Sequence, residues 1–238
     1  MRTSEFLFRV VQSGIIPVIP RRWRLPLFLV AHMRLNPNEP EAGRLARFVP
    51  AGGVAIDAGA NVGLYSYGLS RFCKKVHSFE INLAHCRMLR DFAAPNVEIH
   101  GVGLSNAPGE KTLYTPVHPS GMVLESWASL ETGNCPGARE YLETRVRVVP
   151  LDEMNFPECV FLKVDVEGHE LQVLEGAENT LRRTRPRILI EVRDSNLAAV
   201  DRFLESLDFR RAEIRDFIGC SGAPWNCFYM PIESSASR

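Results

Sequence analysis

Short apolar runs alternate with amphipathic segments from residue 53 onward. A run of about five apolar residues predicts a buried strand, and apolar positions three or four apart predict a helix packed on a sheet. Strands and helices that alternate in this way form a parallel α/β sheet. The pattern predicts strands at 53–57, 75–80, 96–101, 159–164 and 187–192, and helices at 61–71, 82–93, 168–182 and 196–207.

Two regions depart from this alternation. Residues 105–150 form a polar, turn-rich insertion, in which strands are predicted at 111–114 and 144–149. Further along the chain, residues 210–215 and 226–231 predict an antiparallel pair of strands at the edge of the sheet.

The first forty residues are basic and amphipathic. Six arginines but only one acidic residue, Glu5, stand among the first 35 residues, interleaved with large apolar side chains. Pro17, Pro20 and Pro26 divide this stretch into short helical pieces. We expect two parts, an arm at 1–44 and a globular domain at 45–238. The arm is interpreted as a helical cap packed on the domain, or alternatively as a lid or a membrane-surface contact.

Charge and cysteine content narrow the classes of partner. The chain has 28 basic and 28 acidic residues, so it has no overall electrostatic preference for nucleic acid. Its six scattered cysteines include no Cys-x-x-Cys pair and are typical of reduced thiols. No apolar run reaches the length of a membrane span. We expect a cytoplasmic protein with peripheral membrane contact, if any, through residues 1–35; the oligomeric state is not indicated.

A glycine-containing turn follows the first predicted strand. Asp57 ends this strand, and Gly59 and Gly63 flank the turn into the next helix. Because glycine has no Cβ, the turn allows a nucleotide-like ligand to lie against the backbone at a helix N-terminus. A dinucleotide-binding turn has a glycine where this chain has Asn61. The acidic Asp57 also favours a cationic ligand over a pyrophosphate.

The next predicted strand ends in an acidic residue, Glu80. A carboxylate at this position can accept hydrogen bonds from both ribose hydroxyls of a nucleoside. Alternatively, it interacts with the dipole of the helix that follows. Its distance from the glycine turn favours ribose binding.

Ionisable residues crowd the end of the strand predicted at 159–164. Lys163, Asp165, Glu167 and His169 occupy alternate positions there. Ligands of open α/β sheets bind outside the carboxyl ends of the strands, so we expect these side chains to line a crevice. Buried charges without partners are costly, which favours a functional use for the cluster.

Several of these segments together resemble the FkbM-type methyltransferases. The most specific is Lys-x-Asp-x-Glu-Gly-His-Glu, which stands intact at 163–170. The resemblance covers roughly 45–232 and implies S-adenosylmethionine as methyl donor. It also implies a class I methyltransferase fold, a Rossmann-like, doubly wound, mostly parallel seven-stranded sheet with an antiparallel edge. The other matching segments are 48–66, 76–80, 96–106, 149–153, 162–177 and 186–191.

The resemblance also assigns the donor site by position. The turn after the first strand would surround the methionine part, the acidic residue after the second strand the ribose, and a serine after the third strand the adenine. The residues implied are Asp57, Gly59, Ala60, Asn61 and Gly63 for methionine, Glu80 for ribose and Ser105 for adenine.

Family members commonly methylate hydroxyls of sugars, glycans or other small molecules and natural products, so we expect O-methylation of such an acceptor. A hydroxyl is a poor nucleophile until a base removes its proton or a metal lowers its pKa. His169, with an ordinary pKa of about 6.5, is the natural base. Asp165 or Glu167 would orient His169 or act as the base instead. Carboxylates beside a histidine also suit magnesium, but the spacing does not demand a metal and none is predicted.

Three other functions fit parts of the pattern. An NAD-dependent dehydrogenase is disfavoured by Asn61 and by the acidic cluster at 165–170. A nucleic-acid amino-methyltransferase would have an Asn/Asp-Pro-Pro-aromatic turn where Asp165-Val-Glu-Gly stands. A non-catalytic or membrane-associated nucleotide-binding module on the same fold remains an alternative. The sequence does not name the acceptor, and we expect specificity to reside in the insertion and the arm.

Overall fold

The computed structural model describes residues 39–92, 94–132, 135 and 138–233, together with Pro20, Trp23, Pro26 and Leu27. Most of the predicted arm therefore lies outside the described residues, and its role stays a prediction. The segment that follows it is part of the core. Leu45, in the short helix η3 (Leu45–Arg47), and Phe48 are buried in an apolar cluster with side chains of the central sheet.

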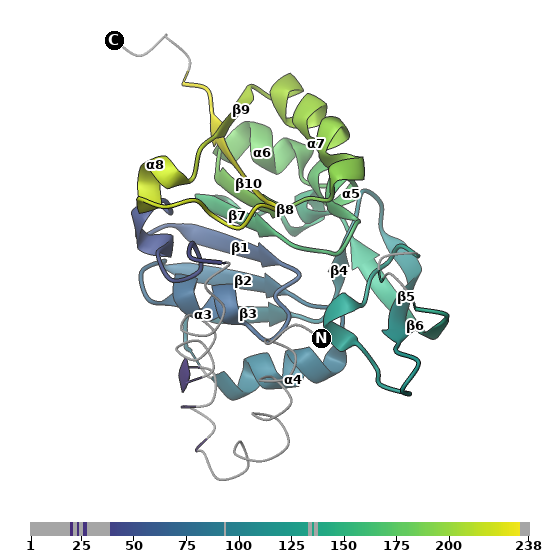
Figure 1. Cartoon of the computed structure of the whole chain (residues 1–238). Coiled ribbons are helices and arrows are strands. Elements are labelled where there is room, and N and C mark those ends of the chain that lie inside the picture. Colours follow the sequence, from purple (N-terminus) through teal and green to yellow (C-terminus); the bar gives the residue numbers. More distant parts are fainter. Residues whose placement is uncertain are drawn as a thin grey trace.

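A seven-stranded sheet forms the centre of the molecule, in the order β3-β2-β1-β7-β8-β10-β9 (Figure 1). Neighbouring strands are parallel from β3 to β8, whereas β10 runs antiparallel to both β8 and β9. This confirms the predicted fold class, a mostly parallel sheet whose edge contains an antiparallel pair. The strands are β1 (Val54–Ala58), β2 (Lys75–Phe79), β3 (Val97–His100), β7 (Phe161–Val164), β8 (Arg187–Glu191), β9 (Phe209–Ala212) and β10 (Asn226–Pro231).

Side chains of the central strands alternate between two apolar clusters, as the period of two in a strand requires. Ile56 and Leu162 belong to one cluster, and their neighbours Ala55 and Phe161 belong to the other. Helices therefore cover both faces of the sheet. The first cluster includes side chains of α5 (Glu170–Glu175), α6 (Glu178–Thr184) and α7 (Asp194–Ser206), and the second those of α3 (Leu64–Ser70) and α8 (Arg215–Ile218).

The prediction of one continuous helix at 168–182 is wrong. The structure has two helices there, because α5 ends before Gly176 and α6 begins at Glu178. A Cβ on Gly176 would lie 2.0 Å from the carbonyl oxygen of Ser105, so only glycine permits this close approach. The Asp152 carboxylate then accepts hydrogen bonds from the backbone N–H groups of Asn179 and Thr180, at 2.9 and 2.8 Å. Such bonds satisfy donors that a helix start leaves open.

The insertion forms a second sheet of three strands, in the order β4-β6-β5. The strands predicted at 111–114 and 144–149 are confirmed and belong to a longer antiparallel hairpin. In Figure 1 the arrowheads of β1, β2 and β3 point toward this hairpin, which therefore stands beside their carboxyl ends. The remaining elements are β4 (Gly103–Leu104), β5 (Gly109–Val117), β6 (Glu140–Val149), α4 (Leu83–Phe92), η4 (Glu125–Trp127) and η5 (Leu151–Met154).

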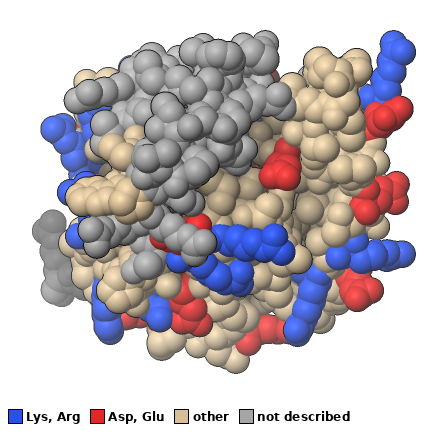
Figure 2. All heavy atoms as spheres, turned by 90° about the horizontal axis from the view of Figure 1, so that it is seen from below, with Lys and Arg blue, Asp and Glu red and all other residues tan. Residues whose placement is uncertain are grey.

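Charged side chains of both signs lie on the surface, and the cysteines are free thiols. Figure 2 shows one face of the molecule, on which Lys and Arg side chains are interspersed with Asp and Glu side chains. All six cysteines are described, and none of them forms a disulfide. Among the described residues, no helix combines the length and the apolar character needed to cross a membrane.

Candidate functional site

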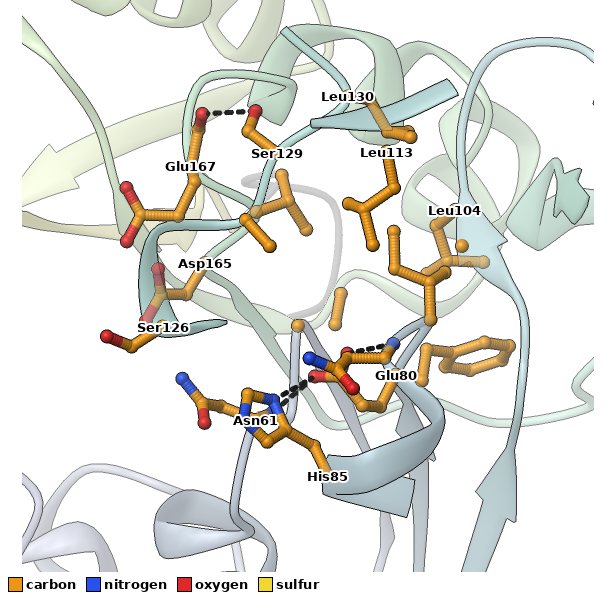
Figure 3. A pocket seen from close by; sticks show the side chains of 18 of the residues that line it. Asn61, Glu80, His85, Leu104, Leu113, Ser126, Ser129, Leu130, Asp165 and Glu167 are labelled. Atoms are coloured by element: carbon orange, nitrogen blue, oxygen red, sulfur yellow. Dashed lines mark hydrogen bonds and ion pairs between the residues drawn. The ribbon is translucent and has the colours of Figure 1, made fainter. Parts of the chain in front are cut away.

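A cavity lies at the carboxyl ends of β1, β2 and β7, between the central sheet and the insertion. Figure 3 shows three kinds of lining. Asp165 and Glu167 stand on one side, leucines stand on the other, and polar side chains form the base. The labelled leucines are Leu104, Leu113 and Leu130, and the labelled polar side chains at the base are Asn61, Glu80 and His85.

The residues of the glycine turn explain its backbone conformation. Gly59 has a φ of 80°, and a Cβ at this position would lie 1.8 Å from the carbonyl oxygen of Asp165. Gly63 has a φ of 93° and precedes α3. Asn61 has a φ of 49°, in the left-handed region that asparagine adopts more readily than most residues. Gly59 and Asn61 line the cavity, whereas Ala60 and Gly63 support the turn from behind.

Glu80 is held by the backbone around the cavity. One carboxylate oxygen accepts the N–H of Asn61 at 2.7 Å, and the other accepts the N–H of Asn82 at 2.6 Å. Burial raises the pKa of Glu80 to about 7, although these two hydrogen bonds act in the opposite direction. Each carboxylate oxygen can accept more than one hydrogen bond, so the group retains capacity for two hydroxyl donors. These acceptor positions fit the two hydroxyls of a ribose.

Asp57 lies beneath the cavity and not in its lining. Its side chain is 1% exposed, and one oxygen accepts a hydrogen bond from the Ser66 hydroxyl at 2.5 Å. Ser66 in turn lies 2.7 Å from the hydroxyl of Ser78 on β2. Burial raises the pKa of Asp57 to about 6, against the lowering effects of Ser66 and Lys163. Asp57 therefore ties β1, β2 and the start of α3 together under the turn.

Lys163 is a buried cation among carboxylates. It is 1% exposed, and its Nζ lies 3.4 Å from an oxygen of Asp165. Asp57 is its neighbour across the β1–β7 pairing. Burial alone would lower the pKa of Lys163, but Asp165, Glu191 and Asp57 outweigh it and raise the pKa. Conversely, burial and the charge of Asp165 raise the pKa of Glu191 to about 9. Lys163 thus neutralises part of an acidic group of side chains.

Glu167 stands on the acidic side of the cavity in a strained backbone, with a φ of 56°. Its carboxylate lies 3.2 Å from Nη2 of Arg193. Burial and the neighbouring Asp165 raise the pKa of Glu167 to about 7, and Arg193 opposes them. The carbonyl oxygen of Glu167 accepts a hydrogen bond from the Ser129 hydroxyl at 2.7 Å (Figure 3).

His169 and Ser105 are joined to each other outside the cavity lining. His169 is 1% exposed, its Nε2 lies 2.9 Å from the Ser105 hydroxyl, and its Nδ1 lies 2.7 Å from Glu131 Oε1. Burial lowers the pKa of His169, although Glu131 opposes this. Because a carboxylate only accepts hydrogen bonds, Nδ1–H of His169 donates to Glu131, and Nε2 lies within hydrogen-bond distance of the Ser105 hydroxyl. Both ring nitrogens are engaged within the protein.

The structure brings together most of the residues expected from the sequence, but in two layers. Five line the cavity, and the others lie behind it. The residues in the lining are Gly59, Asn61, Glu80, Asp165 and Glu167, and those outside it are Asp57, Ala60, Gly63, Ser105, Lys163 and His169.

Sequence reasoning missed several residues of the site. His85, on the first turn of α4, is 2% exposed and lines the cavity with Nε2 3.5 Å from Glu125 Oε2. Burial lowers its pKa to about 4. The signal in the sequence is its place at the start of the helix that follows Glu80. Ser129 and Glu131 carry no such signal, because only the folded insertion brings them to the loop after β7.

Comparison with known proteins supports this architecture. Residues 57–211 match the methyltransferase FkbM domain family. The AMB antimetabolite synthetase AmbE of Pseudomonas aeruginosa is 28% identical over 183 residues, which are 61% of this chain and 9% of AmbE. The chain therefore spans only a small part of that relative.

Two solved structures superpose on this chain, and the first of them shares its fold. Methyltransferase FkbM from Methylobacillus flagellatus KT superposes with a TM-score of 0.52 at 18% identity, over 76% of this chain and 43% of that one. An rRNA methylase from Streptococcus thermophilus superposes with a TM-score of 0.49 at 15% identity, over 82% of this chain and 95% of that one.

The family match includes the glycine turn, Glu80 and the charged cluster after β7, and it extends over more than half of the chain. The resemblance recognised from these motifs is therefore confirmed. The chain belongs to the methyltransferase FkbM domain family.

Proposed function

We propose that this methyltransferase transfers the methyl group to a hydroxyl of a small molecule, a sugar or glycan, or a natural product. The observation that carries the proposal is a cavity with a buried carboxylate, Glu80, at its base and two further carboxylates, Asp165 and Glu167, on one side. A hydroxyl acceptor needs a group that removes its proton, and a carboxylate in the cavity lining supplies one. The name of the Pseudomonas relative, an antimetabolite synthetase, fits an acceptor of the natural-product class.

The donor would be held by the turn and by Glu80. Gly59 and Asn61 line the cavity, and Glu80 would accept hydrogen bonds from the ribose hydroxyls. Asp57, Ala60, Gly63 and Ser105 would support these contacts from the layer behind. S-adenosylmethionine supplies an electrophilic methyl group on a sulfonium, and the acidic side chains around the cavity favour such a cation.

Glu167 is the group we assign as the base. A pKa of about 7 lets its carboxylate accept a proton near neutral pH and release it again. Asp165 is paired with Lys163 at 3.4 Å, which suits it to electrostatic support of the site. His169 uses both ring nitrogens within the protein, so we assign it as a positioning residue for the loop that carries Glu167.

The acceptor would lie between the acidic side chains and the leucines of the insertion. Leu104, Leu113 and Leu130 supply an apolar surface, and Ser126 adds a hydroxyl to the lining (Figure 3). An acceptor with one apolar face and one hydroxyl-bearing face matches this lining. In this assignment residues 45–238 form the catalytic domain, and residues 1–44 complete it as a cap or provide peripheral membrane contact.

A screen of hydroxyl-containing acceptors with methyl-labelled S-adenosylmethionine tests the proposal. We expect label in an ether that resists mild base, formed by the unaltered protein and lost in Glu167→Gln. Label found only on nitrogen or carbon atoms would contradict O-methylation while leaving the methyltransferase assignment in place. Asp91→Asn, a change on α4 away from the cavity lining, serves as the control with unchanged activity.

A further inference from the structure

Two histidines and a glutamate meet at the β2–β3 edge of the sheet, away from the methyltransferase cavity. His77 on β2 is the register partner of Glu98 on β3, and His100 follows Glu98 by two positions. In paired parallel strands, residues two apart lie on the same face, so all three side chains project together. None of the three lines the cavity.

The three side chains are spaced as metal ligands. His77 Nδ1 lies 3.0 Å from His100 Nε2, and the Glu98 carboxylate oxygens lie 3.9 Å from the first nitrogen and 3.8 Å from the second. In a tetrahedral zinc site with bonds of about 2.0–2.1 Å, neighbouring ligand atoms are roughly 3.3 Å apart. Among the described residues, this is the group of His, Cys, Asp and Glu side chains close enough to share an ion.

Metal binding requires each imidazole to present a nitrogen lone pair. Without an ion, the short contact between the two ring nitrogens is a hydrogen bond in which one ring carries the proton. For both facing nitrogens to bind a dication, the donating ring would carry its proton on its other nitrogen instead, so that each ring stays neutral and offers one lone pair.

Aromatic rings fix the orientation of both imidazoles. The Phe156 ring lies 4.3 Å from the His77 ring, and the Phe79 ring stacks on His100 at 4.5 Å with an interplanar angle of 15°. Glu98, by contrast, is 50% exposed on its side chain, so an ion and water can enter from its side. Rigid nitrogen ligands with one open side are typical of sites with three protein ligands and a water.

One side chain competes with a metal for Glu98. Nζ of Lys75 lies 2.9 Å from Glu98 Oε2, and its side chain is 37% exposed. The ammonium can swing into solvent when a dication takes its place, but its displacement weakens metal binding. A substitution that removes the Lys75 ammonium should therefore change the affinity of the site for a metal ion.

We propose that His77, Glu98 and His100 form a binding site for one divalent transition-metal ion of the zinc type, with water as a further ligand. Imidazole and carboxylate ligands suit Zn²⁺ and its neighbours in the first row. The ion would join the edge strand β3 to β2 and thereby stabilise the side of the sheet that carries Glu80. The site is separate from the proposed methyl transfer and does not depend on it.

Calorimetric titration of the full-length protein with Zn²⁺, repeated with Co²⁺ and visible absorption, tests the site. We expect one ion per chain and a spectrum of nitrogen and oxygen ligands. His100→Gln and Glu98→Gln should each weaken binding more than tenfold, because loss of even an outer-sphere partner costs 10–100-fold. His118→Gln, which alters an exposed histidine, is the matched control with unchanged affinity.

Lys75→Met keeps the test decisive even if a histidine variant does not fold. We expect it to tighten Zn²⁺ binding about two- to fivefold, the equivalent of an exposed ion pair. Three results would overturn the proposal: no stoichiometric ion on the unaltered protein, equal affinity in Glu98→Gln, or no change in Lys75→Met. A thiolate charge-transfer band with Co²⁺ would also overturn it, because the ion would then sit on a cysteine.

Discussion

Nδ1 of His169 lies 2.7 Å from Glu131 Oε1, which joins the loop after β7 to the insertion. A second contact runs parallel to it, from the Ser129 hydroxyl to the carbonyl oxygen of Glu167. Two segments that lie far apart in the sequence are thereby fastened together beside the cavity. The insertion consequently has a defined position against the acidic side of the site.

The His169–Glu131 contact should appear as coupling in a double-mutant cycle. Glu131→Ala and His169→Ala should be less than additive in free energy of unfolding, with a coupling of about 1 kcal/mol, because the Glu131 side chain is 46% exposed. Urea denaturation of the single and double variants measures it. Glu125→Ala combined with His169→Ala is the control, because Glu125 faces His85 instead, and this pair should be additive within about 0.5 kcal/mol.

The raised pKa of Glu80 predicts a pH-dependent affinity for S-adenosylhomocysteine. The pKa is about 7 in the free protein, and the ribose hydroxyls favour the ionised carboxylate. Below that pKa a proton must leave before binding, so affinity should rise roughly tenfold from about pH 6 to about pH 8. Calorimetry at several pH values measures this. The pKa of Asp57 is lower, about 6, so Glu80→Gln should remove most of the change in affinity between pH 6 and pH 8. An equal change in affinity in this variant would show that another group controls the pH dependence.

Removal of the buried cation at Lys163 should destabilise the fold strongly. Lys163→Met leaves Asp57, Asp165 and Glu191 without their shared positive charge. The loss of one partner from a buried ion pair costs about 3–5 kcal/mol. Urea denaturation gives the value, and Lys74→Met is the control because its side chain is 69% exposed, with an expected loss below about 1 kcal/mol. Equal losses in the two variants would contradict the described charge arrangement.

Alanine substitutions at Gly59 and Gly52 distinguish the cost of a steric clash from the cost of a positive φ. Both have φ near 80°, but a Cβ on Gly59 meets the Asp165 carbonyl at 1.8 Å, whereas a Cβ on Gly52 meets nothing within 4 Å. Gly52→Ala should cost about 1–2 kcal/mol of unfolding free energy for its positive φ. Gly59→Ala should cost about 1–3 kcal/mol more, because of the clash, and should also weaken S-adenosylhomocysteine binding. The free energies of unfolding of the two variants, measured under the same conditions, test this prediction.

The sequence predicts the sheet well because each central strand is a short apolar run followed by a recognisable helix. Ile56 and Leu162 fit this pattern directly. It also identifies Glu80 and the charged cluster, since both stand at strand ends. It does not separate Asp165, in the cavity lining, from His169, behind it. That distinction depends on Glu131, whose approach is a tertiary contact between distant segments with no periodic signal.

The break between α5 and α6 was not predictable for a related reason. Gly176 within a helical pattern is usually tolerated at a modest cost. Here the close approach of the Ser105 carbonyl and the capping by Asp152 decide the break, and both come from outside the helix.

The central claim is that a carboxylate of the cavity, Glu167, removes the proton of a hydroxyl acceptor. The most direct test is the single-turnover rate of methyl transfer by Glu167→Gln, with the affinity for S-adenosylhomocysteine measured on the same sample. We expect the rate to fall by about 10²–10⁴-fold, the usual contribution of a general base, while the affinity changes less than about twofold. A rate equal to that of the unaltered protein would contradict the claim.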